Sequence, residues 1–124
     1  MEITGVDFVT VPAEDFEAST HFYGTVLGLP FRKRWGSMPG AEYQAGNLTL
    51  AIMEPTAFGS EFHRHHLPIA LHVDDVAVAK ADLEAQGVKF VSDVFDSGVC
   101  LQAMFLDPAG NVLGLHHRYA PEED

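Results

Sequence analysis

Two segments of the chain have the apolar spacing of helices that pack one face against a core. The first lies between Asp15, a residue type that caps helix N-termini, and Gly28, a residue type that ends helices. The second begins at Asp74 and Asp75 and stops at Gly87. We therefore predict two helices, whose apolar sets are Phe16, Phe22, Tyr23, Val26 and Leu27 in the first, and Val76, Ala79 and Leu83 in the second.

Most of the remaining length has the composition of extended segments. These predicted strands cover residues 3–11, 29–35, 41–45, 47–53, 67–73, 88–95, 99–106 and 111–117. In order, the chain reads as a βαβββ unit followed by a second βαβββ unit, and Ala-Gly-Asn occurs at 45–47 and again at 109–111. We predict an α+β domain built from a duplicated module. Module one covers about 3–54, the linker 55–66 and module two about 67–119.

Composition and net charge limit the kinds of binding partner that we expect. The chain has 124 residues, enough for one domain, and its formal net charge of −11 argues against nucleic acid or an anionic membrane as a partner. The apolar runs are too short to span a bilayer, and the first residues lack the order of a signal peptide. Cys100, the single cysteine, fits a reducing compartment. We therefore expect a cytoplasmic protein whose partner is a small molecule.

Two motifs resemble those of a known family. The run from Asp15 to Gly28 is similar to the Asp-x-x-x-Ser-x-x-Phe-Tyr-x-x-Val-Leu-Gly pattern of the vicinal oxygen chelate superfamily, and 105–115 is similar to its closing Asp-Pro-x-Gly-Asn turn and last strand. That superfamily holds glyoxalase I, bleomycin-resistance proteins, extradiol dioxygenases and methylmalonyl-CoA epimerases. The resemblance implies paired βαβββ modules whose sheets curl round an open cup, commonly in a homodimer.

Metal-dependent members of this superfamily generally place one His or Glu ligand on the first and last strand of each module. Carried over to this sequence, those positions are Phe8 (or Asp7 in a register shifted by one), Ala51 (or Thr49), Pro68 and Gly114. The first choice at each position offers no side-chain atom that binds a metal. We therefore expect no cofactor at the usual site, although a divalent metal elsewhere stays open.

Two histidines leave open the hypothesis of a functional site displaced from the usual metal-ligand positions. Residues two apart on a strand share a face, so His72 is expected on the face of Pro68, and His116 on that of Gly114, both facing the cup. His117 should face the other way. His72 and His116 could hold a relocated metal, completed by His63, His65 or His66, or could act as an acid/base pair. They could equally bind a ligand or serve only a structural role.

A second group of residues is expected to line the cup and contact a ligand. Aromatic and methionine side chains with a few hydroxyl and amide groups suit a mostly apolar, flat molecule. The expected contacts are Phe8, Thr10, Trp35, Tyr43, Thr49, Met53 and Gln102. No phosphate-binding glycine loop and no Gly-x-Ser-x-Gly motif is present, so hydride transfer and serine hydrolysis have no support.

Two functions follow. The favoured one is metal-free binding of a small aromatic or cationic molecule, in the manner of bleomycin-resistance proteins. The alternative is an isomerase, lyase or dioxygenase-like enzyme that uses His72 and His116.

Overall fold

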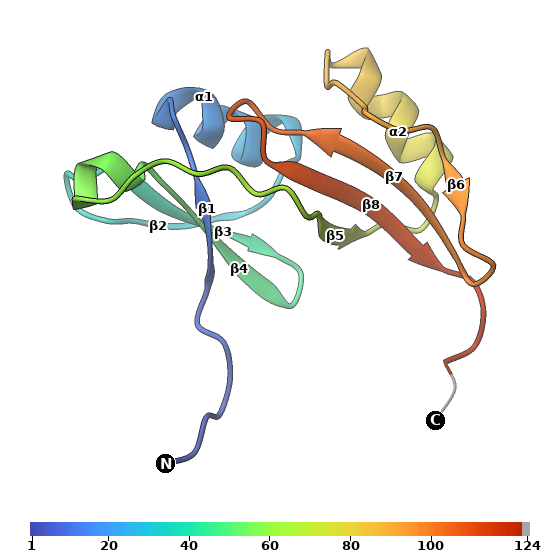
Figure 1. The fold of residues 1–124 in the computed structure, drawn as a ribbon, viewed down its shortest axis with the longest axis horizontal. Helices are drawn as coiled ribbons and strands as arrows, with labels where there is room; N and C mark the ends of the chain where they lie inside the picture. Colours follow the sequence, from blue (N-terminus) through green and yellow to red (C-terminus); the bar gives the residue numbers. More distant parts are fainter. Residues whose placement is uncertain (123–124) are drawn as a thin grey trace. The chain divides into compact units, whose positions relative to one another are not determined.

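A four-stranded sheet organises the first half of the computed structural model, which describes residues 1–122 (Figure 1). Its strand order is β1-β4-β3-β2, with β1 parallel to β4 and the other neighbours antiparallel. Its elements are β1 (Val9–Pro12), α1 (Phe16–His21), β2 (Phe31–Arg34), β3 (Gly40–Ala45) and β4 (Leu48–Met53). We call this half, Met1–Arg64, the first unit.

The second unit, which begins at His65, repeats this plan. Its sheet has the order β5-β8-β7-β6, with β5 parallel to β8. Its elements are β5 (Ile69–His72), α2 (Val76–Ala85), β6 (Phe95–Asp96), β7 (Cys100–Leu106) and β8 (Val112–Arg118). The predicted α+β fold of two tandem βαβββ modules is therefore confirmed.

The predicted helix signals act as expected. The side chain of Asp15 accepts a hydrogen bond from the backbone N of Ala18 (3.1 Å), and Asp75 does the same for Val78 (3.0 Å). Gly28 and Gly87 adopt φ values of 69° and 87°, which favour glycine. Within the first predicted helix, Phe22–Val26 form a π-helical turn that continues α1.

Each unit has its own apolar core between its sheet and its helix. In the first, Val11, Leu50 and Ile52 are fully buried. In the second, Ala103, Phe105, Leu113 and Leu115 alternate along β7 and β8 and are at most 3% exposed. Among the described residues, no helix is long and apolar enough to cross a membrane.

Two predicted strands differ most from the expectation. The strand predicted over 3–11 begins only at Val9, which pairs with Leu50 of β4. The strand predicted over 88–95 is reduced to β6, which starts at its last residue, and a bridge between Phe90 and Phe105.

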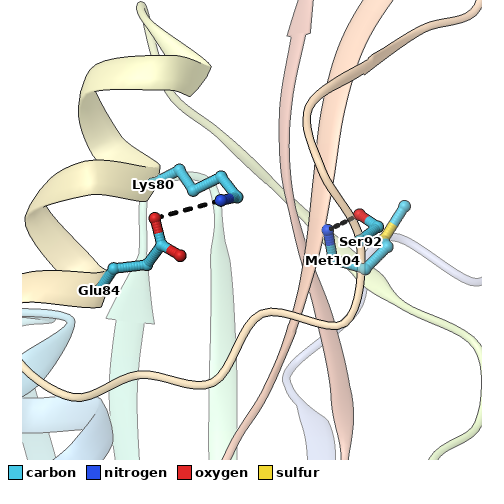
Figure 2. A network of polar contacts seen from close by, with 4 residues as sticks. All are labelled: Lys80, Glu84, Ser92 and Met104. Carbon is cyan, nitrogen blue, oxygen red and sulfur yellow. Dashed lines mark hydrogen bonds and ion pairs between the residues drawn. The ribbon is translucent and has the colours of Figure 1, made fainter.

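Figure 2 shows a side-chain contact in the segment that lacks the expected strand. The hydroxyl oxygen of Ser92 accepts the backbone N–H of Met104 (2.9 Å), so a side chain takes the place of a strand carbonyl. On α2, Lys80 binds Glu84 (Nζ–Oε1 3.1 Å), and its ammonium lies 5.1 Å from the centre of the Phe90 ring. Backbone hydrogen bonds from Val91 N to Met104 O (2.9 Å) and from Leu106 N to Lys89 O (3.0 Å) also hold this segment beside β7.

Candidate functional site

The first sheet has one face toward α1 and a second face, here called the far face. In the strand register, Thr10 lies beside Ala51, and Ala51 lies beside Glu42. Because side chains alternate along a strand, these residues point away from the buried Val11 and Leu50. The far face thus consists of Thr10, Gly40, Glu42, Gln44, Thr49, Ala51 and Met53.

Tyr43 does not belong to the far face, and the prediction that it lines the same surface as Thr49 and Met53 is wrong. It pairs with Leu50 and is only 7% exposed. A hydrogen bond with Thr20 of α1 and contact with Gly24 show that it packs beneath the helix. Burial raises the pKa of the Tyr43 phenol, an effect that the Thr20 hydrogen bond and the charge of Arg34 partly oppose.

Three aromatic rings gather over the far face. The ring of Trp35 lies 5.7 Å from that of Phe8 and 5.9 Å, edge to face, from that of Phe58. Trp35 packs directly on Gly40: a Cβ added there would lie 2.3 Å from Trp35 Cε3. Phe8 and Phe58 keep 42% and 43% of their surface exposed. We call Phe8, Trp35 and Phe58 the aromatic cluster.

A carboxylate lies beneath this cluster. Glu42, on β3, is 8% exposed, and its Oε2 accepts a hydrogen bond from Trp35 Nε1 (2.7 Å). Within residues 1–122 this is its one side-chain hydrogen bond, and no ion pair includes it. Glu42 is the main residue that the sequence interpretation missed; its signal was the alternation of Glu42 and Gln44 around the buried Tyr43.

The other end of the far face is polar. Arg32 Nη1 donates to the hydroxyl of Thr49 (2.8 Å), which donates in turn to Oε1 of Gln44 (2.8 Å). Thr49, predicted as a ligand contact, is 4% exposed, so its hydroxyl is already used inside the protein. Thr10 is exposed and Met53 partly exposed, which leaves both accessible as predicted contacts.

In the second sheet, three residues that were predicted as site residues lie side by side on neighbouring strands. His116 of β8 lies between His72 of β5 and Gln102 of β7 in the register. The side chain of His72 is 67% exposed, and its Nε2 lies 3.3 Å from Oδ1 of Asp74. Its ring also lies 5.7 Å from the ring of His117, a contact that the strand alternation did not predict.

A model of the Glyoxalase/Bleomycin resistance protein/Dioxygenase superfamily matches residues 5–115. The chain belongs to this superfamily.

Solved structures agree with this assignment. TnmS3, an antibiotic binding protein from Streptomyces sp. CB03234, is 27% identical with a TM-score of 0.78, over 95% of this chain and 98% of that chain. A glyoxalase/bleomycin resistance protein from the same organism is also 27% identical, with a TM-score of 0.68, over 87% and 96%. Lactoylglutathione lyase from Agrobacterium tumefaciens, at 17% identity and a TM-score of 0.78 over 93% and 94%, shares the fold. No curated protein matches the chain.

Phe8, Ala51, Pro68 and Gly114, the residues expected at the usual metal-ligand positions, have no side-chain atom that ligates a metal. Ala51 lies beside Thr10 in the first sheet, and Gly114 lies beside Ala70 in the second. A Cβ at Gly114 would lie 3.0 Å from Met104 Sδ, so sulfur and not a carboxylate borders this position. No group of three His, Cys, Asp or Glu side chains within residues 1–122 is placed to share an ion.

Proposed function

We propose that this protein binds a small aromatic or cationic molecule on the far face of its first sheet, without a metal at the usual ligand positions. The observation that carries the proposal is the aromatic cluster above the enclosed carboxylate of Glu42. Partly exposed aromatic rings with one fixed polar group are typical of small-molecule sites. We further propose a homodimer that works in the cytoplasm.

The comparison with TnmS3 supports a binding role. That protein is described as antibiotic binding, and it is 27% identical to this chain over almost the full length of both. The net charge of −11 favours a cationic ligand over an anionic one, since it gives the surface a negative potential. A binding protein needs none of the metal-ligating groups that Phe8, Ala51, Pro68 and Gly114 lack.

The test uses Trp35, the single tryptophan of the chain, as a reporter inside the cluster. We expect aromatic and cationic antibiotics, bleomycin among them, to change its fluorescence saturably and to raise the melting temperature without being converted. Phe58→Ala should weaken binding roughly five- to tenfold, because an aromatic contact contributes about 1 kcal/mol. Phe95→Ala is the matched control, because Phe95 of the second unit is 42% exposed. Equal losses in both variants, or no binding by any compound, would contradict the proposal.

A different observation carries the second candidate, an isomerase, lyase or dioxygenase-like enzyme. His72 and His116 are neighbours in the register, and Asp74 lies beside His72, so two imidazoles and a carboxylate are available for acid/base catalysis. If this function holds, His72→Ala and His116→Ala should each lower turnover about 100-fold or more. His21→Ala, at the exposed last residue of α1, should leave it unchanged. Turnover that survives both substitutions would exclude this candidate.

A further inference from the structure

We infer that the far face of the first sheet selects an organic ammonium ion, and that Glu42 sets this preference. The inference rests on the proposed binding function and names the class of ligand. The first observation is that the buried carboxylate of Glu42 forms no ion pair with any residue between 1 and 122. This carboxylate is 8% exposed, and its hydrogen-bond partner, the Trp35 indole, carries no charge.

The basic residues nearest in the register do not neutralise it. Lys33 lies opposite Glu42 on β2, yet the two form no ion pair. Arg32 donates to the neutral side chains of Thr49 and Gln44. Burying a carboxylate away from water without a paired cation costs free energy. Leaving a buried charge without the partner of its ion pair is strongly destabilising. A positively charged ligand would give Glu42 the ion-pair partner that neither Lys33 nor Arg32 provides.

The rings above the carboxylate favour the same kind of ligand. The face of an aromatic ring is negative and attracts cations, most strongly for tryptophan, and aromatic surfaces recognise ammonium groups with alkyl substituents. Trp35 lies between Phe8 and Phe58, and both phenyl rings are about two-fifths exposed. An alkylammonium group can therefore contact ring surface while it lies close to the charge of Glu42.

The same features disfavour the other classes of ligand. An anion would meet Glu42 and the negative faces of the rings. A metal ion such as Ca²⁺ takes six to eight oxygen ligands, and within the described residues Glu42 belongs to no group of three acidic, histidine or cysteine side chains that could hold one. A neutral molecule would gain from the rings but would leave the carboxylate without a counter-charge.

Choline and 3,3-dimethylbutan-1-ol test this inference, because they have the same shape and differ only in the charged nitrogen. Binding to the full-length chain is followed by Trp35 fluorescence and by ligand NMR signals. We expect choline to bind at least tenfold more tightly than the alcohol. Glu42→Gln keeps an acceptor for the indole N–H and should remove most of this difference. Glu14→Gln, at an exposed position of the same unit, makes the same change in net charge and should preserve it.

The outcomes separate this inference from the proposed function. Equal affinities for choline and the alcohol would overturn the ammonium preference and leave small-molecule binding in place. The same conclusion would follow if neither probe bound while the antibiotics did. No binding by any of these compounds would overturn both. The comparison of the two probes on the unmodified protein does not depend on any variant folding. For Glu42→Gln, urea unfolding confirms that a lost preference is not a lost fold.

Discussion

Replacing Asn111 with alanine is expected to destabilise the protein by roughly 3 kcal/mol, through loss of buried hydrogen bonds. Asn111 is fully buried; its Nδ2 donates to Asp107 Oδ2 (2.8 Å), and its Oδ1 accepts the backbone N–H of His65 (2.8 Å). Asp107 is itself only 5% exposed. Alanine removes these bonds, one of them to a carboxylate, and leaves a small cavity.

Asn47 provides the control, because it holds the same place in the other Ala-Gly-Asn repeat but is exposed. Asn47→Ala should change stability by less than about 0.5 kcal/mol, as surface substitutions usually do. Urea unfolding followed by circular dichroism measures both variants. If the two lose similar stability, the buried network contributes far less than its geometry indicates.

Gly40→Ala is expected to displace Trp35, with a cost of roughly 2 kcal/mol and a weakened binding site. The added methyl group would lie 2.3 Å from Cε3 and 2.7 Å from Cδ2 of the indole, so the ring must move away from the sheet. That movement breaks the Trp35–Glu42 hydrogen bond and separates the rings of the aromatic cluster. Trp35 emission should shift to longer wavelength, and affinity for the compounds that bind should fall at least tenfold.

Gly5→Ala is the matched variant, because no atom lies within 4 Å of an added Cβ there. It should leave emission and urea midpoint unchanged. Gly40→Ala with normal emission and normal affinity would show that the close packing of Trp35 on Gly40 is unimportant for the site.

The sequence predicted the secondary-structure elements that are determined by short local signals. Aspartate caps and glycine stops define the helix ends, and Asp15, Asp75, Gly28 and Gly87 behave as predicted. The fold followed from the repeated order of these elements. Strand lengths depend on partners, which the sequence does not display: 3–8 lack strand pairing, and Ser92 replaces a ladder carbonyl with its side chain.

The site was less predictable, because it depends on which face of each strand is covered. Tyr43 was expected to line the cup because it is aromatic, but α1 covers its side of β3. Glutamate is usually a solvent-exposed residue type, but Glu42 is 8% exposed and accepts a hydrogen bond from Trp35, which packs on Gly40. Phe58 lies outside the strands, in the turn Pro55–Phe58, so no periodicity indicated its contact with Trp35.

The repeated strand order of the two sheets has a consequence for how the chain can change. In each unit the first strand lies parallel to the last, with Ala51 beside Thr10 in one and Gly114 beside Ala70 in the other. Around these positions the halves have diverged: one carries tryptophan and glutamate, and the other carries histidines on its first and last strands. Because each unit has the same strand order and its own core, substitutions on the sheet of one half can change its chemistry while the other half keeps its own.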